Sequence, residues 1–305
     1  MRRVLRSRRC GHRAALQRLF RSALAASALL MVSPAAGEGL LVSAAASLTN
    51  AVGAVARQFE AANPGVTVVC NFAGSGTLLR QLEQGAPVDV FAAADQTTMD
   101  QAQQAGLILP RTRATFATNT LVLITRPIPG ARPGGGPVDR AIPHSMGIVT
   151  RPIPGARPEG TLAALLGEGR ELLAVGNPKF VPVGRYARQA LNRGGLWERL
   201  EGRLVLGNSA RQVLDYVARG EVGAGVVYAT DAMAAGDRVR VVGSLQGHRP
   251  IVYPAAVTAA SGQPQLARRF MGFLCGDTGQ EILARKGFGP PPSDIAAGPS
   301  RPADG

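Results

Sequence analysis

The stretch LLVSAAASLTNAVGAVARQFEAANPG, residues 40–65, decides the fold of this chain. It opens with an apolar run, residues 40–46, which is typical of a buried strand. The polar residues that follow are of types that often start helices: Ser47, Thr49 and Asn50. Apolar side chains then recur at helical spacing until an Asn-Pro-Gly sequence ends the helix at Gly65. The stretch therefore predicts a strand, a turn that carries a hydroxyl group, and a helix.

The turn at Ser47 is a candidate anion site. The first turn of a helix has backbone N–H groups without an intrahelical partner and a partial positive charge of about +0.5, and anions bind at such places. A serine at this position can also do no more than cap the helix. Recurrence of similar turns elsewhere in the chain decides between the two roles.

Four later stretches repeat the pattern of strand, polar turn and helix. Their strands are predicted at residues 65–72, 172–176, 204–206 and 223–228. The turns after them contain Gly74, Ser75 and Gly76, then Val183 and Gly184, then Asn208, Ser209 and Ala210, and finally Tyr228 and Thr230. This alternation predicts an α/β fold with mostly parallel sheets covered by helices. In such sheets, the crevice beyond the carboxyl ends of the strands collects the turns.

The remaining elements complete the predicted fold. Further strands are expected at residues 88–94, 119–125, 239–243 and 250–256. Helices are expected at residues 95–104, 162–166 and 263–286.

The amino-terminal segment, residues 1–37, predicts export. It holds eight arginines and no acidic residue, then the apolar run SALAASALLMV at residues 22–32 and a series of small residues. This is the pattern of a cleavable secretory signal, and the apolar run is too short to span a bilayer. We therefore expect a soluble periplasmic protein. Its two remaining cysteines, Cys70 and Cys275, are expected as separately buried thiols and not as a disulfide.

The charge of the chain gives little support to a nucleic-acid partner. The 305 residues carry a net charge of +14, which by itself would suggest one. Eight of the arginines lie in residues 1–37, so the rest of the chain carries only +6. Without those arginines, a nucleic-acid binder with steep salt dependence is not expected.

Two segments are expected to lack regular structure. The sequence TRPIPGARP occurs at residues 125–133 and again at residues 150–158. A single identical copy, displaced by 25 residues, indicates a local duplication and not a structural repeat. The proline and glycine content of the segment predicts a flexible surface loop over residues 125–158. Residues 293–305 are predicted to form a disordered tail.

No constellation of catalytic residues is apparent. The three histidines, His12, His144 and His248, are not at metal-ligand spacing, and no CxxC or HExxH motif occurs. A serine nucleophile needs a neighbouring base, and no histidine lies near a strand-to-helix turn. We expect no enzyme, although a secreted hydrolase that uses Ser47 or Ser75 stays open until ester and amide turnover is measured.

The turns do offer several uncharged hydrogen-bond donors, without Arg or Lys in the site. Five charge-assisted hydrogen bonds of about 1.5–3 kcal/mol each give roughly 7–15 kcal/mol, and micromolar binding needs about 8 kcal/mol. A pocket that offers only hydrogen-bond donors disfavours a protonated anion, because the anion's O–H group would face another donor. The pattern therefore favours a fully ionised tetrahedral oxyanion over phosphate.

Four blocks resemble, in the same order, the periplasmic molybdate-binding proteins of ABC importers: SAAASLTNAV, NFAGSGTLLRQLEQGAPVDVFAAAD, LLAVGNPKFVPVGRYARQAL and VGAGVVYATDAM. The resemblance extends from about residue 40 to residue 288. It implies a two-lobe periplasmic-binding-protein type II fold, in which each lobe is a mostly parallel sheet flanked by helices. It also implies that molybdate or tungstate binds in the cleft between the lobes and passes to a membrane permease. No cofactor is implied, and we expect a monomer.

The resemblance assigns the site by motif. Ser47 and Ser75 match hydroxyl and backbone donors of the first lobe. Val183 and Ala210 match backbone N–H donors of the second lobe, and Tyr228 matches a phenol donor. The family more often has alanine where Val183 stands and valine where Ala210 stands. Both changes keep the backbone donors, but Val183 is expected to narrow the pocket.

The lobe boundaries follow from the same comparison. Lobe I is expected to comprise residues 38–118 and 249–292, and lobe II residues 119–248. A receptor for a different tetrahedral oxyanion, such as sulfate, is the alternative that stays open. These anions carry the same charge, so only the size of the cavity distinguishes between them.

Overall fold

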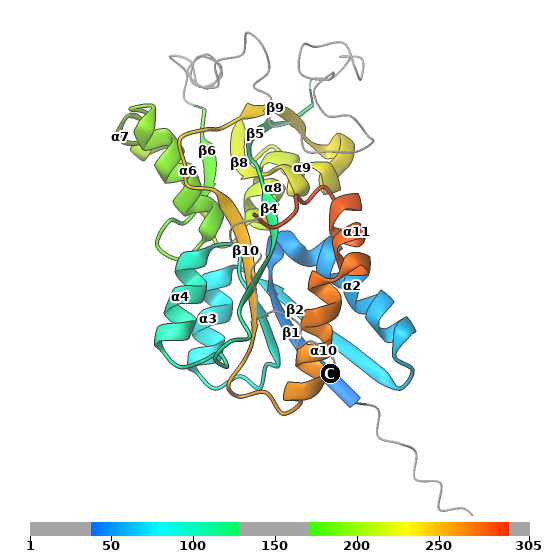
Figure 1. The fold of residues 1–305 in the computed structure, drawn as a ribbon. Coiled ribbons are helices and arrows are strands. Elements are labelled where there is room, and N and C mark those ends of the chain that lie inside the picture. Colours follow the sequence, from blue (N-terminus) through cyan, green and yellow to red (C-terminus); the bar gives the residue numbers. More distant parts are fainter. Residues whose placement is uncertain (1–37, 128–170, 293–305) are drawn as a thin grey trace, which may run out of the picture. The chain divides into compact units, whose positions relative to one another are not determined.

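The structure, a computed structural model, describes residues 38–127 and 171–292 (Figure 1). The predicted signal segment, nearly all of the duplicated loop, the helix expected at residues 162–166 and the predicted tail lie outside these residues. No helix in the two described ranges is long and apolar enough to cross a membrane.

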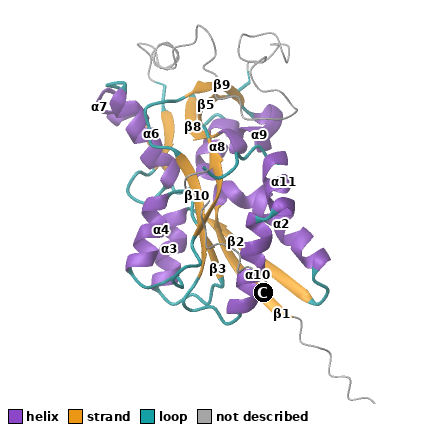
Figure 2. Ribbon diagram, in the orientation of Figure 1, coloured by secondary structure: helices purple, strands orange, loops and turns teal. Residues whose placement is uncertain are grey.

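The first sheet has the strand order β2-β1-β3-β10-β4. Its strands are β1 (Glu38–Ala45), β2 (Val66–Ala73), β3 (Val90–Ala92), β4 (Ala114–Asn119) and β10 (Ile251–Val257). One face is covered by α2 (Thr49–Ala62), α10 (Pro264–Cys275) and α11 (Asp277–Arg285), and the other by α3 (Ser75–Glu83) and α4 (Gln96–Gln104) (Figures 1 and 2).

The second sheet has the strand order β7-β6-β8-β5-β9. Its strands are β5 (Leu121–Thr125), β6 (Leu173–Gly176), β7 (Leu204–Gly207), β8 (Ala224–Tyr228) and β9 (Arg240–Ser244). One face is covered by α6 (Pro182–Arg193) and α7 (Trp197–Leu200), and the other by α8 (Ala210–Arg219) and α9 (Ala229–Ala235).

The side chains of β3 show why a continuous apolar run forms a strand here. Val90 and Ala92 belong to the apolar cluster beneath α2 and α10, whereas Phe91 belongs to the cluster beneath α3 and α4. Successive side chains of a strand point to opposite faces, so a strand covered by helices on both faces must be apolar at every position. The predicted α/β class follows from this burial and is confirmed.

Each sheet contains one strand that runs against the other four: β10 in the first sheet and β5 in the second. Each reversed strand is the one that the chain forms directly after crossing from the other sheet. The chain thus builds most of one sheet, crosses, builds the second, and returns to finish the first. The two sheets are mixed but mostly parallel, and the expected two-lobe architecture is confirmed.

The crossings between the sheets are short. Only Thr120 lies between β4 and β5, and residues 245–250 lead back from β9 to β10. The carboxyl-terminal segment reaches the first crossing as well, because Thr118 and Gly289 exchange two backbone hydrogen bonds of 2.9 and 3.0 Å.

Two sequence predictions about helices and strands were wrong, and one about the cysteines was wrong in part. The strand expected at residues 119–125 is two strands, β4 and β5, which belong to different sheets. The helix expected at residues 263–286 is broken at Gly276, whose extended backbone ends α10 and starts α11. Cys70 and Cys275 are free thiols, as expected, but Cys275 is exposed and Cys70 only half-buried.

Candidate ligand-binding site

The strand-to-helix turns of the two sheets contact each other directly. The backbone N–H of Gly76, after β2, donates to the carbonyl oxygen of Phe180, before α6, at 3.1 Å. Gly74 lies against the backbone of Asn208, before α8, and a Cβ atom added at Gly74 would overlap the Asn208 carbonyl oxygen. A Cβ atom added at Gly76 would likewise overlap the Phe180 carbonyl oxygen, so glycine is required at both positions for steric reasons. The turns after β2, β6 and β7 meet at one point.

Ser47 lies in a 3-10 turn (Ala46–Leu48) between β1 and α2 and is buried. Its side chain makes no capping hydrogen bond at α2, whose cap position is Leu48. Instead, its hydroxyl oxygen lies 3.3 Å from the hydroxyl oxygen of Tyr253 in β10. Capping therefore does not account for a buried serine at this position.

Ser75 is the first residue of α3 and is also buried. Its hydroxyl oxygen accepts a hydrogen bond of 3.1 Å from the backbone N–H of Ala94. Because the oxygen is the acceptor in this bond, the hydroxyl hydrogen is left for another partner.

Val183 and Ala210 lie in the first turns of α6 and α8, where backbone N–H groups have no intrahelical partner. Ser209 caps α8 by accepting the Gln212 N–H at 3.2 Å. The Val183 side chain packs in the apolar core against Gly176, at the end of β6. The expectation that this side chain narrows the pocket is therefore not supported.

Tyr228 is the last residue of β8 and is 1% exposed. Its hydroxyl oxygen is buried and has no hydrogen-bond partner in the part of the chain that the structure describes. Burial, followed by the neighbouring Tyr253 and Tyr186, raises the pKa of Tyr228 well above its usual value. The phenol therefore stays protonated and offers a hydrogen at neutral pH.

Tyr253 connects Tyr228 to Ser47. The two tyrosine rings meet edge to face with centroids 5.8 Å apart, and the Tyr253 hydroxyl lies beside that of Ser47. The turn after β1 also packs against α8. The structure thus brings together the turns that contain all five predicted site residues, Ser47, Ser75, Val183, Ala210 and Tyr228.

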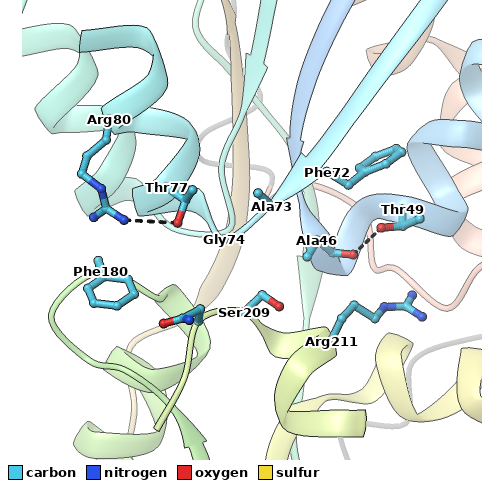
Figure 3. Close-up of a pocket in the computed structure, with 11 residues that line it drawn as sticks. Ala46, Thr49, Phe72, Ala73, Gly74, Thr77, Arg80, Phe180, Ser209 and Arg211 are labelled. Carbon is cyan, nitrogen blue, oxygen red and sulfur yellow. Dashed lines mark hydrogen bonds between the residues drawn. The ribbon is translucent and has the colours of Figure 1, made fainter. Parts of the chain in front are cut away.

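A pocket of about 500 Å³ lies at the rim of these turns (Figure 3). It is lined by the residues that directly precede three of the predicted site residues: Ala46, Gly74 and Ser209. Arg80 and Phe180 lie on one side of it and Arg211 on the other. The Arg80 guanidinium stacks over the Phe180 ring at 5.1 Å. The sequence argument assumed a region without cations, and these two arginines correct it for the rim of the site.

Arg211 is paired with a buried carboxylate. Its Nε lies 2.9 Å from Asp231, which is fully buried in the first turn of α9. Burial raises the pKa of Asp231 to about 6, although the Arg211 charge acts in the opposite direction. Asp231 therefore offsets part of the Arg211 charge close to the start of α8.

A second ion pair, unlike the first, joins a helix of the first sheet to a helix of the second. Arg185 in α6 donates to Asp95 at 2.7 Å and to the Thr98 hydroxyl at 2.6 Å. Asp95 also caps α4 by accepting the Thr98 N–H at 3.0 Å. Both charged side chains are largely buried. The pair therefore holds α4 of the first sheet against α6 of the second.

The chemistry of the site is that of hydrogen donation. Among the described residues, no group of three or more His, Cys, Asp or Glu side chains could hold a metal ion. His248 lies against Tyr186, and its ring nitrogens lie 2.7 and 3.0 Å from the carbonyl oxygens of Arg249 and Leu245. It is therefore not placed as a base for Ser47 or Ser75.

Sequence reasoning missed the polar groups beneath the site. Asn119, at the end of β4, bonds both to the Tyr253 hydroxyl at 3.0 Å and to the Thr230 hydroxyl at 2.9 Å. An asparagine just before the apolar run at residues 121–124, and a tyrosine within the strand predicted at residues 250–256, were the available signals. Neither signal indicates which distant residue is the partner.

Two sheets whose strand-to-helix turns face one another define the class of two-lobe solute-binding proteins, which enclose a small ligand between the sheets. Residues 40–289 match the family described as bacterial extracellular solute-binding protein. The chain belongs to this family, whose members bind solutes and are not enzymes.

Known proteins support this assignment. The chain is 37% identical to the molybdate-binding protein ModA of Escherichia coli (strain K12) over 256 residues, which cover 83% of this chain and 90% of that protein. It resembles the solved structure of the Azotobacter vinelandii periplasmic molybdate-binding protein with a TM-score of 0.65 and 26% identity, covering 83% and 100% of the two chains. The sulfate-binding protein SubI from Mycobacterium tuberculosis H37Rv has a TM-score of 0.66 at 18% identity, covering 85% and 89%. At that identity, the likeness is one of fold.

Proposed function

We propose that this protein captures molybdate or tungstate outside the cytoplasm and delivers it to the membrane permease of an ABC importer. Relatives that carry the name molybdate-binding protein support the choice of anion. The family supports the role of a solute receptor. The ligand is the transported solute, and no cofactor is involved.

The buried Tyr228 hydroxyl is the observation that carries the proposal. A buried polar group without a partner costs about 1–3 kcal/mol, so such groups are kept where they serve a ligand. Tyr228 lies where the turns of both sheets converge, and among the described residues its hydroxyl has no partner. An oxyanion bound at this point would accept its hydrogen.

The other four residues supply further donors in this proposal. Ser47 and Ser75 donate through their hydroxyl groups. Val183 and Ala210 donate through backbone N–H groups at the starts of α6 and α8, where the partial positive charge of each helix also favours an anion. The anion would thus be held between the two sheets by groups from both.

Closure of two lobes on the anion is part of the proposal. We assign lobe I to residues 38–118 and 249–292 and lobe II to residues 119–248, because the chain crosses between its sheets near those positions. We further propose that residues 1–37 direct export to the periplasm and that the protein acts as a monomer. Gel filtration with and without molybdate tests the last point, since a dimer in either condition would contradict it.

Isothermal titration calorimetry of the purified protein tests the choice of ligand. We expect tight binding of molybdate and tungstate and no measurable binding of phosphate. Ser75→Ala should weaken molybdate binding at least about tenfold, because a hydrogen bond to a charged group contributes about 1.5–3 kcal/mol. Ser244→Ala, in the half-buried β9, is the matched control and should bind as the wild type does. Absence of heat with all four anions, sulfate included, would refute the proposal.

Sulfate is the second candidate, favoured by the fold shared with a sulfate-binding protein. Molybdate and sulfate carry the same charge, so only the size of the closed site separates them. Tighter binding of sulfate than of molybdate in the same titration would establish this alternative.

A further inference from the structure

The Ser47 hydroxyl belongs to a chain of polar groups that joins the two sheets. Its oxygen lies 3.3 Å from the Tyr253 hydroxyl oxygen, and the Asn119 side-chain nitrogen lies 3.0 Å from that same phenol oxygen. The same nitrogen lies 2.9 Å from the hydroxyl oxygen of Thr230 at the start of α9. This series of polar groups therefore runs from the turn after β1, through β10 and β4, to Thr230 in the first turn of α9.

One donor that cannot reverse its role fixes the direction of the two bonds that Asn119 makes through its side-chain nitrogen. The backbone N–H of Thr120 lies 2.8 Å from Oδ1 of Asn119, and a backbone N–H can only donate. Oδ1 is therefore the acceptor end of the Asn119 amide, and Nδ2 donates to the Tyr253 oxygen. A phenol has a single hydrogen. Among the described residues, the Ser47 oxygen is the one acceptor within hydrogen-bond distance of this buried phenol, so we assign Tyr253 as the donor and Ser47 as the acceptor.

The Ser47 hydroxyl is then left with its hydrogen available to be donated to an anion. Its oxygen accepts from Tyr253, and its own hydrogen remains to be donated. Ser75 is in the same state, because its oxygen accepts the Ala94 N–H at 3.1 Å. In Ser75 the fixed donor is a backbone group, whereas in Ser47 it is a side chain that can be removed by mutation.

We propose that Tyr253, oriented by Asn119, is a positioning residue that fixes Ser47 as a hydrogen-bond donor to the bound oxyanion. This inference rests on the function proposed above. A hydroxyl that is already turned in the correct direction loses no rotational freedom when the anion binds. The Tyr253 ring has a separate role, since it packs against Tyr228 and Phe288 with centroids 5.8 and 5.3 Å away. Tyr253→Phe keeps these ring contacts and removes the hydroxyl alone.

A double-mutant cycle with Tyr253→Phe and Ser47→Ala tests the inference, with molybdate affinity measured by calorimetry. If Tyr253 acts through Ser47, removing its hydroxyl matters only while the Ser47 hydroxyl is present. We expect Tyr253→Phe to weaken binding about 5- to 20-fold in the wild type and less than about twofold in Ser47→Ala. Equal losses in both backgrounds, or no loss in either, would overturn the inference, because a general structural effect does not depend on Ser47.

Tyr186→Phe is the matched control. Tyr186 is a buried tyrosine of α6 whose ring packs edge to face against His248. Its substitution should have the same effect in both backgrounds. If Tyr253→Phe does not fold, Asn119→Ala takes its place in the cycle, because it removes the donor that orients the phenol.

The same experiment separates the inference from the proposed function. Wild-type protein that binds none of the anions would refute the function, and the inference with it. Wild-type protein that binds molybdate and a cycle without coupling would refute the inference alone.

Discussion

Replacement of Tyr228 by phenylalanine should separate ligand binding from folding stability. Phenylalanine keeps the ring contact with Tyr253, at 5.8 Å between centroids, and removes a hydroxyl that has no partner among the described residues. No hydrogen bond within the described protein is lost. We therefore expect the free energy of unfolding of the ligand-free protein to fall by no more than about 0.5 kcal/mol, and it can rise.

Ligand affinity should respond in the opposite way. A hydrogen bond to a charged acceptor contributes about 1.5–3 kcal/mol, which corresponds to a dissociation constant about 10 to 150 times larger. At a molybdate concentration about 1,000 times the wild-type dissociation constant, the anion should stabilise the wild type by about 4 kcal/mol. A variant that binds about 50-fold more weakly should gain only about 2 kcal/mol at the same concentration.

Urea denaturation with and without molybdate, together with calorimetry, measures both quantities. Tyr216→Phe, a half-buried tyrosine of α8, is the control and should change neither. A Tyr228→Phe variant that binds molybdate as the wild type does, but unfolds more than about 1 kcal/mol more easily, would refute the reasoning. The hydroxyl would then belong to the fold and not to the ligand.

Three other perturbations test separate parts of the site. Gly76→Ala should weaken molybdate binding at least about tenfold by calorimetry, because the new methyl group would overlap the Phe180 carbonyl oxygen and hold the sheets apart. Arg185→Gln removes the cation that lies 2.7 Å from Asp95, and stopped-flow measurements should show molybdate release about ten times faster. Burial raises the pKa of Asp231 to about 6, above the unfolded value of about 3.9. The stability that its proton contributes is therefore present at low pH and lost as the pH rises through 6, so lowering the pH from 7 to 5 should stabilise the wild type against urea by about 1 kcal/mol relative to Asp231→Asn.

Each of these predictions has an outcome that contradicts it. Full affinity in Gly76→Ala would show that the two sheets need not touch when the anion is bound. An unchanged release rate in Arg185→Gln would show that the ion pair between Arg185 and Asp95 does not hold the sheets together around the ligand. Parallel pH dependences for the wild type and Asp231→Asn would mean that Asp231 does not titrate in this range.

The sequence predicts the fold well where local pattern and burial agree. The run at residues 40–46 forms β1 and the periodic stretch behind it forms α2, because apolar residues there serve both the element and the core. Prediction failed where contacts with distant parts of the chain decide the secondary structure. A segment of mixed polarity, residues 114–119, forms β4 because β10 supplies its hydrogen-bond partners from a distant part of the chain. At Gly276, one periodic pattern conceals a break between two helices.

The site shows the same division. Hydroxyl groups and helix starts at successive turns indicate an anion site from sequence alone, because parallel strands bring such turns to one edge. The hydrogen bond between Asn119 and Tyr253 spans 134 positions, and nothing local to either residue specifies the other. Arg211 is visible in the sequence directly after Ala210, but only its contact with Asp231 shows where its charge lies.

The short crossing between β4 and β5 has a consequence for how the protein takes up its ligand. Only Thr120 lies between the two strands, so the closure proposed above would turn the sheets about this link. Groups beside a pivot move less than distant ones, so in the proposed closure Asn119, Tyr253 and Ser47 would keep the arrangement described above. In the proposed function, the anion would then meet donors that are already in position beside the link, and the groups farther from it would complete the site on closure.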